Sequence, residues 1–496
     1  MFYNMYIQMN FKHTLKHKND DFWRCLFNAN SIAVIGAKAA MGTWGYDAIK
    51  AATDAVKANP KRKAYPVNPN ETEIMGLKVY KNVADIPAPV EMAIIVVPAG
   101  AVPQVFRDCA AKGVKSAVVI SAGFGEVDNN GAKLQDEINQ IAREGGIRFI
   151  GPNCTGHADF HTRVGSIGFA DMIPTGNMAL LSQSGTLGLS IMQIAAARGI
   201  GFSKFVSTGN EADLRLEDYL EYLANDDNTH VISLYIEGLR EGRRFFNLAK
   251  EITRKKPIIA VKSGTTSGAA KAARSHTGAL SGSDTIYTAA FKQSGVIRVQ
   301  DEEEMCDAAI CYSLLPLPRG NRVAILTIGG GFGVMTAEDC EKEGLEIAEL
   351  QPQTIKKMQA IMPSRWVPGN PVDLVGIRTG GKDNTGERCL QFLLEDKNVD
   401  AIISLLPPMM LPPATVNAMK PEQLKAMLKE VESSQAKLYK QLKEYEKPLV
   451  YIRRWSPPTA KGVDTTPKMM IPEYSHPRRA ARVFRYLAAY RKYLLQ

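Results

Sequence analysis

One histidine of the sequence lies in a setting suited to chemistry. His276 sits in the run Ala-Ala-Arg-Ser-His-Thr-Gly, which follows an apolar segment and a loop rich in Ser, Gly and Ala. Small neighbours leave room for a phosphate group and allow the backbone angles of the loop to change. A neutral imidazole nitrogen is nucleophilic near pH 7, so it can accept a phosphoryl group and pass it on. These features indicate a nucleophilic role for His276, although a lone histidine is more often a surface or packed residue.

Two glutamates could orient this imidazole. Glu237 ends the apolar run Leu-Tyr-Ile-Glu-Gly, and Glu211 lies in Ser-Thr-Gly-Asn-Glu-Ala-Asp-Leu. A carboxylate that accepts the Nδ1–H group would fix the tautomer and leave Nε2 free to attack. The carboxyl end of a strand is where active-site residues of open α/β sheets gather, which favours Glu237. Glu211 remains the alternative, and a plain surface role remains open for both.

Two helix starts are predicted to hold the phosphate. One is the turn that includes Ser182, Ser184, Gly185 and Thr186, where hydroxyls and unpaired backbone N–H groups converge. The spacing is close to that of a nucleophile elbow but lacks its first glycine, so Ser184 is interpreted as a phosphate ligand. The second is the segment with Thr277 and Gly278. A third loop, 329–333, also resembles an anion site, although a tight turn is at least as good an interpretation.

The elements that position these residues repeat along the chain. Three segments, 31–52, 177–199 and 322–344, each run from an apolar strand through a small-residue loop into a helical pattern. Continuous β-branched runs suit buried parallel strands. Three such starts, roughly 145 residues apart, predict three α/β domains in series. The predicted limits are an N-terminal extension 1–21, domains 22–157 and 158–300, a linker 301–320, and a third domain 321–496.

Further strands and helices are predicted within these domains. The expected strands are 63–69, 91–98, 116–123 and 147–153 in the first domain, 202–208, 230–238, 256–264 and 295–299 in the second, and 400–408 and 447–455 in the third. Residues 301–320 are expected to form a helix followed by a Pro/Gly linker. The Lys/Glu-rich stretch 420–446 is expected to form an exposed helix.

The first small-residue loop favours a particular class of ligand. Gly36, Gly42 and Gly45 bracket the turn, so backbone N–H groups and the helix start could face a phosphate. Their spacing is not GxGxxG. The next strand ends in Tyr-Pro-Val-Asn-Pro, without the acid that binds the ribose of NAD. Basic residues precede it, which favours coenzyme A or NADP over NAD. A Rossmann domain without any nucleotide is the remaining alternative.

Composition excludes several classes. The 496 residues are 45% hydrophobic and 23% charged, which is ordinary for a globular protein. No uncharged apolar run is long enough to span a bilayer, and the first residues lack the unbroken apolar stretch of a signal peptide. The seven cysteines form no CxxC pair. Reduced thiols and a cytoplasmic location are therefore expected, without a disulfide framework or a zinc site.

The positive charge is concentrated at the C-terminal end. The formal net charge is +10, and residues 447–496 contain eleven lysines and arginines against two acids. Such a segment can bind nucleic acid or an acidic partner, or can be solvated surface. It contains no repeated nucleic-acid motif, so nucleic-acid binding is not expected. Together with the helix at 420–446, this basic segment is a candidate surface for docking a partner.

A series of motifs resembles one enzyme family. SIAVIGA with Gly42 and Gly45, YPVNPNETEIMGLKVYKNVADIP, AIIVVPA, SAGF and GPNC resemble the CoA-binding domain of NDP-forming acyl-CoA synthetases. LLSQSGTLG, VSTGNEADL, YIEG, ARSHTGALSGSD and NPVDL continue the resemblance over residues 22–380. This family includes ADP-forming acetate–CoA ligases and relatives of succinyl-CoA synthetase. The implied fold is α/β, with an N-terminal Rossmann-like CoA-binding domain followed by two flavodoxin-like domains of the succinyl-CoA-synthetase type.

The resemblance implies roles for individual residues. His276 falls on the phosphorylated histidine, Glu237 on the glutamate that orients it, and Gly209 and Asn210 would close the phosphate pocket. The implied CoA-binding residues are Gly36, Ala37, Gly42, Thr43, Gly45, Asn68, Pro98, Ser121, Ala122, Gly123 and Asn153. One departure lies in the first loop, where the family often has Ser and Lys but this chain has residues 37–41 as Ala-Lys-Ala-Ala-Met.

The same resemblance implies an α-type subunit. The expected reaction interconverts acyl-CoA, phosphate and ADP with acid, CoA and ATP through an acyl phosphate and a phosphohistidine. No Walker A motif or ATP-grasp-like stretch occurs, so ADP/ATP and Mg²⁺ are expected on a β-type ATP-grasp partner, and no metal site on this chain. A hetero-oligomer or a homodimer of α chains is expected. The alternatives are a non-catalytic CoA-binding regulatory or scaffold protein and a Rossmann oxidoreductase.

Overall fold

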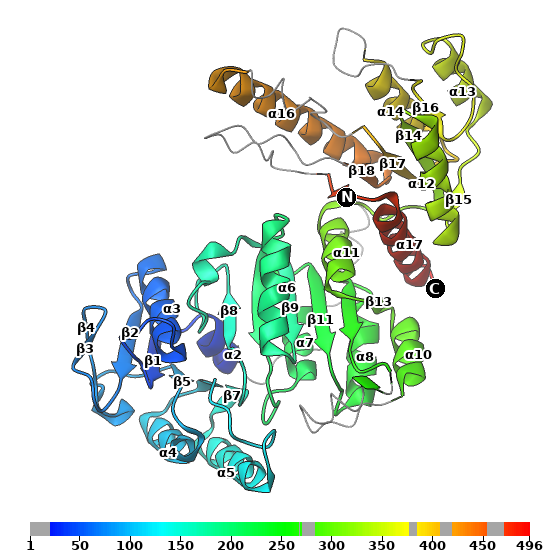
Figure 1. The fold of residues 1–496 in the computed structure, drawn as a ribbon. Coiled ribbons are helices and arrows are strands. Elements are labelled where there is room, and N and C mark those ends of the chain that lie inside the picture. Colours follow the sequence, from blue (N-terminus) through cyan, green and yellow to red (C-terminus); the bar gives the residue numbers. More distant parts are fainter. Residues whose placement is uncertain (1–19, 267, 270–282, 376–383, 407–418, 454–470) are drawn as a thin grey trace. The chain divides into compact units, whose positions relative to one another are not determined.

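The chain forms two units, and each is described by itself. The computed structural model describes all residues except 1–19, 267, 270–282, 376–383, 407–418 and 454–470 (Figure 1). The first unit comprises residues 1–256 and 262–290, and the second comprises residues 257–261 and 291–496. Within the described residues, no helix is long and apolar enough to cross a membrane.

The first sheet of the first unit is entirely parallel. Its order is β2 (Lys63–Val67), β1 (Ser31–Ile35), β5 (Met92–Ile95), β6 (Ser116–Val119) and β7 (Arg148–Ile150). Strand β1 is buried along its whole length, as its continuous apolar run predicts. The chain places β2 on one side of β1 and β5 on the other. The carboxyl end of β1 is therefore a topological switch point, where ligands bind in open α/β sheets.

Helices and short elements complete this part of the unit. The longer helices are α2 (Asp20–Phe27), α3 (Trp44–Ala58), α4 (Val102–Lys112) and α5 (Asn129–Gly145), and α4 and α5 lie side by side (Figure 1). The short elements are the hairpin of β3 (Glu73–Ile74) and β4 (Leu77–Lys78) and the 3₁₀ turns η1 (Val83–Asp85) and η2 (Ala99–Ala101).

A second sheet repeats the same arrangement. Strand β9 (Thr175–Ser182) lies between β11 (Val231–Ile236) and β10 (Phe202–Ser207) in parallel, and β8 (His157–Asp159) is antiparallel at the edge. The connecting elements are η3 (Ala170–Met172), α6 (Gly185–Ala197), α7 (Leu216–Ala224) and α8 (Gly242–Ile252). Ser182 pairs with Tyr235, so the residues that follow β9 and β11 are neighbours. The chain again changes side at the central strand, which places a second switch point at the end of β9.

Strand β12 (Ile258–Lys262) and helix α10 (Asp284–Ser294) lie at the limits between the units, and β12 pairs in parallel with β13 (Ile297–Val299). The second unit contains a parallel sheet of its own. Its order is β15 (Glu346–Ile347), β14 (Arg322–Thr327), β17 (Ala401–Ser404), β18 (Leu449–Ile452) and β19 (Glu473–Tyr474), and β16 (Val372–Asp373) also pairs with β14. Its helices are α11 (Glu302–Leu314), α12 (Gly330–Lys342), α13 (Pro352–Gln359), α14 (Thr385–Glu395), α16 (Pro421–Tyr445) and α17 (Pro477–Leu494).

The basic C-terminal segment is part of this second unit. Helix α17 packs against α11 and α12 and buries Phe484 in the core of the sheet. Arg479 forms an ion pair of 2.6 Å with Asp307, and Arg485 lies 3.3 Å from Glu343. These two arginines are thus paired with acids on α11 and at the end of α12. The docking role expected of the basic segment stays a prediction.

The α/β class is confirmed, and so are the predicted strands. Each predicted strand segment contains an observed one, and the predicted helices at 301–320 and 420–446 are α11 and α16. The sequence did not indicate β3, β4, β8, β15, β16 and β19. These strands are two or three residues long, too short to show a hydrophobic period. The predicted domain limits remain predictions.

Candidate active site

The loop after β1 is built by close backbone approaches. Gly36 has φ +93°, and a Cβ atom there would lie 2.3 Å from the Val96 carbonyl oxygen. A Cβ atom on Gly45, in the first turn of α3, would lie 2.3 Å from the Gly36 carbonyl oxygen. Both positions therefore require glycine. Gly42 also has positive φ, but no atom lies within 4 Å of its Cβ position, which faces open space.

Two side chains fix this loop. Asn68, almost fully buried, donates through Nδ2 to the Ala37 carbonyl at 2.8 Å. Thr43 is the N-cap of α3: its hydroxyl donates to the Ala40 carbonyl at 2.8 Å and accepts from the Tyr46 N–H group at 3.3 Å. Residues 38–42 are exposed beside this helix start. The loop thus presents accessible backbone N–H groups to an anion.

The other predicted CoA residues lie at the ends of neighbouring strands. Pro98 precedes η2 after β5, and the Ser121 hydroxyl donates to the Val97 carbonyl at 2.5 Å. Asn153, which has φ +57°, donates its backbone N–H group to the Ser121 carbonyl at 2.9 Å. Ala122 is exposed. These residues gather at the carboxyl edge of the first sheet, the edge that also carries the glycine loop.

A carboxylate connects the two sheets of the first unit. Glu126 accepts from the Gly123 N–H group at 2.6 Å and also from the side chain of Asn210. Burial raises the pKa of Glu126, but hydrogen bonds from Asn210 and Gly123 outweigh it, so the pKa lies below its ordinary value. Gly209 packs so closely that a Cβ atom there would lie 2.3 Å from the Pro152 carbonyl oxygen. Gly209 and Asn210, predicted to close the phosphate pocket, therefore lie against the loop of the predicted CoA residue Asn153.

The predicted phosphate turn follows β9 directly. Ser182 is fully buried and its hydroxyl donates to the Ser184 carbonyl at 2.6 Å. Ser184 is the N-cap of α6, and its side chain makes no capping hydrogen bond. Gly185 packs against Thr155, whereas Thr186 is exposed. The start of α6 thus combines an uncommitted hydroxyl with helix N–H groups, while the Ser182 hydroxyl stabilises the turn itself.

The residue between these two serines was missed by sequence reasoning. Gln183 accepts through Oε1 from the backbone N–H groups of Glu237, at 2.6 Å, and Gly238, at 3.0 Å. Its Nε2 group donates to the Gly238 carbonyl at 2.8 Å and to Glu211 Oε1 at 3.0 Å. The side chain therefore joins the ends of β9 and β11 to the loop of Glu211. Its place inside the serine-rich motif was the available signal.

The turn at Glu237 is also held from the opposite side. Lys262, at the end of β12, donates to the Glu237 carbonyl at 2.8 Å. Tyr287 of α10 accepts from the Leu239 N–H group at 3.0 Å, and the Lys262 ammonium group lies 4.7 Å from its ring centroid. Both side chains are buried. A charged residue at the end of an apolar strand was the signal for Lys262.

Glu211, the alternative orienting residue, lies in the same cluster. It is 4% exposed, has φ +52°, and accepts at Oε1 from the Thr208 hydroxyl at 2.9 Å as well as from Gln183. Burial raises the pKa of Glu211 to about 7, although the hydrogen bonds from Gln183 and Thr208 act in the opposite direction. This carboxyl group is therefore partly protonated near neutral pH.

His276, Thr277 and Gly278 lie outside the described residues. Of the described histidines, His157 has a structural role: it is fully buried, and its Nε2 lies 2.9 Å from the Leu26 carbonyl. Burial lowers the pKa of His157 to about 4. This neutral core histidine is no candidate for phosphoryl transfer.

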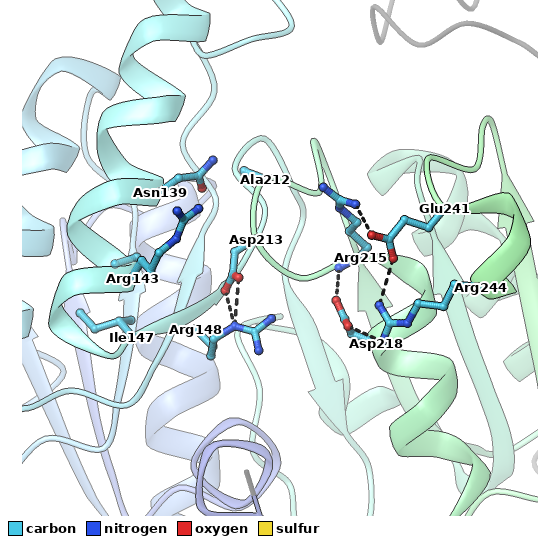
Figure 2. Close-up of a pocket in the computed structure, with 11 residues that line it drawn as sticks. Asn139, Arg143, Ile147, Arg148, Ala212, Asp213, Arg215, Asp218, Glu241 and Arg244 are labelled. Atoms are coloured by element: carbon cyan, nitrogen blue, oxygen red, sulfur yellow. Dashed lines mark hydrogen bonds and ion pairs between the residues drawn. The ribbon is translucent and has the colours of Figure 1, made fainter. Parts of the chain in front are cut away.

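A cavity of about 410 Å³ lies in the first unit beside the loop that follows Glu211 (Figure 2). Asp213 pairs with Arg148 at 2.9 Å, Asp218 with Arg244 at 2.8 Å, and Glu241 bonds to both Arg215 and Arg244. The three acids that line the cavity are thus paired with arginines. Asp213 also accepts from the Phe149 N–H group, so these pairs fix the loop that carries Glu211.

The third glycine-rich loop begins α12 in the second unit. Gly329 is the N-cap, and its N–H group donates to the Thr327 hydroxyl at 3.2 Å. Gly331 has no atom within 4 Å of its Cβ position. The helix start is therefore open, as an anion site requires, but a tight turn accounts for the same geometry. Among the described residues, no group of three His, Cys, Asp or Glu side chains could hold a metal ion.

The geometry supports chemistry at the carboxyl ends of β9 and β11. A helix start with an uncommitted hydroxyl lies beside a clamped turn that carries one carboxylate and beside a second, buried carboxyl group. Helix N–H groups stabilise phosphate, and a fixed carboxylate can orient an imidazole. The nearby glycine loop of the first sheet offers a separate anion site. Together these features suit phosphoryl transfer next to a phosphate-bearing ligand.

Three family models match consecutive parts of the chain. A CoA binding domain matches residues 30–159, a succinyl-CoA ligase like flavodoxin domain matches 175–312, and a Ligase-CoA domain matches 323–437. The chain is 44% identical over 379 residues to the alpha subunit of an ADP-forming acetate–CoA ligase II of Pyrococcus furiosus, covering 76% of this chain and 81% of that one. It is 45% identical to the alpha subunit of ligase I of that organism, over 72% and 77%.

A solved structure agrees with these relatives. The acetyl-coenzyme A synthetase 1 of Candidatus Korarchaeum cryptofilum, solved in complex with phosphate and ADP, matches with a TM-score of 0.81 and 33% identity. The match covers 96% of this chain and 98% of that chain. The chain therefore belongs to the family of ADP-forming acetate–CoA ligases, as an alpha-type subunit.

Proposed function

We propose that this chain catalyses the acyl-transfer half of an ADP-forming acyl-CoA synthetase. The overall reaction interconverts acyl-CoA, phosphate and ADP with a carboxylic acid, CoA and ATP. The observation that carries the proposal is the identity of 44% and 45% to two alpha subunits of acetate–CoA ligases, over most of both chains. Acetate, or another short carboxylic acid, is the first substrate to test.

The loop after β1 fits the phosphate-rich end of coenzyme A. Its helix start is exposed, Gly36 and Gly45 allow the backbone to pass closely, and the Cβ position of Gly42 faces open space. Asn68 and Thr43 hold this shape. The remaining predicted CoA residues line the same sheet edge: Ala37, Pro98, Ser121, Ala122, Gly123 and Asn153.

The chemistry follows from these positions. Phosphate attacks the thioester carbonyl, the C–S bond breaks, and CoA leaves as an acyl phosphate forms. Nε2 of His276 then attacks phosphorus, and the carboxylic acid leaves as a carboxylate. The start of α6, with Ser184, Gly185 and Thr186, would hold the phosphate. Glu237 would accept the Nδ1–H group of His276 and support positive charge on the phosphorylated ring.

A second subunit would complete the reaction. The chain spans 48% of the length of the ADP-forming acetate–CoA ligase of Methanocaldococcus jannaschii and 54% of that of ligase I of Archaeoglobus fulgidus. We infer that a β-type subunit with an ATP-grasp fold supplies the nucleotide site, where ADP accepts the phosphoryl group and Mg²⁺ binds. The assembly would be a hetero-oligomer, or a homodimer of alpha chains. Seven free, buried cysteines are consistent with a cytoplasmic location.

The test measures phosphate-dependent release of the free CoA thiol from acetyl-CoA and a panel of longer and aromatic acyl-CoAs. Adding ADP, Mg²⁺ and a candidate β-type subunit should yield ATP. His276→Ala should abolish ATP formation, whereas the matched variant His161→Ala, on the surface loop after β8, should not. Binding of CoA without thiol release or ATP formation in any arm would reject the synthetase and favour a CoA-binding scaffold.

A further inference from the structure

The amide of Gln183 uses its whole hydrogen-bonding capacity. Its oxygen accepts two backbone N–H groups, from Glu237 and Gly238, and its nitrogen donates to the Gly238 carbonyl and to Glu211. The four distances lie between 2.6 and 3.0 Å. If the amide were turned over, its NH₂ group would face the backbone N–H groups of Glu237 and Gly238. The network therefore fixes the positions of Oε1 and Nε2.

Three of these four hydrogen bonds bind the side chain of Gln183 to the turn that carries Glu237. Positions 237 and 238 follow β11 and have no further strand to pair with, so their polar groups need other partners. Gln183 provides the partners of the two N–H groups and of the Gly238 carbonyl, while Lys262 donates to the Glu237 carbonyl. The backbone N–H group of Gln183 also donates to the Tyr235 carbonyl at 3.2 Å. The side chain therefore ties the turn of Glu237 to the residue next to Ser184, at the start of α6.

We propose that Gln183 is a positioning residue, which holds the backbone of Glu237 in register with the phosphate-binding start of α6. The proposal rests on the proposed function, because Glu237 acts through His276 there. Misplacement of an orienting group by about 1 Å can lower a rate about 100-fold without loss of substrate binding. The CoA loop after β1 makes none of these hydrogen bonds, so acyl-CoA binding should be spared.

Only an amide satisfies all four partners. In Gln183→Glu, the carboxylate still accepts both N–H groups, but its second oxygen faces the Gly238 carbonyl and the Glu211 carboxyl group. Above the pKa of Glu211, about 7, acceptors then oppose acceptors at both contacts, which destabilises the turn. The double variant Gln183→Glu/Glu211→Gln returns a donor, since the amide introduced at position 211 can direct its Nε2 group to the new carboxylate at position 183. The Thr208 hydroxyl can accept as well as donate, so it adapts to this reversal.

The experiment compares kcat and KM for acetyl-CoA in the assembled enzyme, at a pH above the pKa of about 7 of Glu211. Gln183→Glu should lower kcat about 100-fold and change KM less than about threefold. The kcat of the double variant should be about tenfold higher than that of Gln183→Glu, because one of the two lost donor contacts returns. The matched control is Gln140→Glu, on the exposed face of α5, where Gln140 donates to Glu144 at 2.9 Å. It should keep wild-type kcat.

A second readout does not depend on turnover. Amide hydrogen exchange at residues 235–240 should accelerate in Gln183→Glu and slow again in the double variant. Unchanged exchange and kcat within twofold of wild type would overturn the proposal, as would a double variant no better than the single one. An effect confined to KM would also contradict it. The two proposals can fail separately. If the wild-type enzyme shows no turnover but exchange at residues 235–240 changes as expected in the variants, the proposed function is wrong, while Gln183 still holds the Glu237 turn.

Discussion

The loop after β1 and the loop after β9 both start a helix directly behind a buried parallel strand, but they are held in different ways. After β1, glycines bring backbone against backbone, and the helix start stays exposed. After β9, the side chain of Gln183 joins three segments through four hydrogen bonds. A Cβ atom at Gly36 or Gly45 would disrupt the first loop, whereas loss of the Gln183 amide would disrupt the second.

The difference matches the two tasks proposed for these loops. An exposed cradle of N–H groups suits a ligand that must enter and leave. Phosphoryl transfer needs groups held in fixed positions before the reaction starts. If this comparison is correct, substitutions in the first loop should change CoA affinity, whereas substitutions around Gln183 should change turnover or pH dependence.

The largest effect is expected for Gly45→Ala. Its Cβ atom would lie 2.3 Å from the Gly36 carbonyl oxygen, so the loop must shift. Overpacking of this kind costs about 3 kcal/mol, which corresponds to about 100-fold in CoA affinity. Titration calorimetry with CoA measures this loss of affinity. Gly42→Ala is the matched control: no atom lies within 4 Å, so the loss should stay below about tenfold. A larger loss in Gly42→Ala would contradict the close-approach argument.

The residues that shape the first loop could be predicted from the sequence, whereas the contacts that hold the second loop could not. Glycine spacing after a β-branched run is a local signal, so Gly36, Gly42 and Gly45 could be named from the sequence alone. Gln183 meets Glu237 only because β9 and β11 are adjacent, although 54 residues separate them. The topology that makes these strands neighbours has no local signature. For the same reason Lys262, Tyr287 and the buried state of Glu211 were not predicted.

The next largest effect is a pH dependence of stability caused by Glu211, which is bonded to Gln183 of the second loop. The folded-state pKa of Glu211 is about 7, above its ordinary value of 4.5, so the native state binds this proton more tightly than the unfolded chain. The wild type should therefore lose stability as the pH rises from about 4.5 to about 7. Glu211→Gln lacks this loss and should be more stable above pH 7 by about 3 kcal/mol.

Thermal unfolding of both proteins from pH 4 to pH 9 tests this. The two midpoints should agree at pH 4, where both the carboxyl group and the amide are neutral, and diverge with rising pH. Burial is the first cause of the shifted pKa, and hydrogen bonds from Gln183 and Thr208 oppose it. Parallel curves at all pH values would mean that the Glu211 carboxylate is solvated rather than buried.

A smaller effect is expected at the opposite side of the Glu237 turn. Tyr287→Phe removes the acceptor of the Leu239 N–H group, which should cost about 1 kcal/mol and lower kcat about fivefold. Tyr80→Phe is the matched control: the Tyr80 ring lies 6.0 Å from that of Tyr65 in β2 of the first sheet, so kcat should not change. A normal kcat in Tyr287→Phe would show that the hydrogen bond to the Leu239 N–H group is not needed to hold the turn.

The smallest effect is expected at the helix cap of the first loop. Thr43→Ala removes the hydroxyl that bonds Ala40 and Tyr46, so stability should fall by about 1 kcal/mol and CoA affinity by a few fold. Thr53→Ala, within the same helix, is the matched control and should spare CoA affinity. A change in kcat at saturating CoA, rather than in affinity, would remove the distinction between the two loops.

The most direct test of the account is labelling of the protein by phosphate. The enzyme is incubated with radioactive inorganic phosphate and acetyl-CoA, without nucleotide, and the protein is assayed for label that is stable to base and labile to acid. The account predicts label in the wild type, none in His276→Ala, and strongly reduced label in Glu237→Gln. Label that persists in His276→Ala, or that forms without acetyl-CoA, would contradict phosphoryl transfer through this histidine.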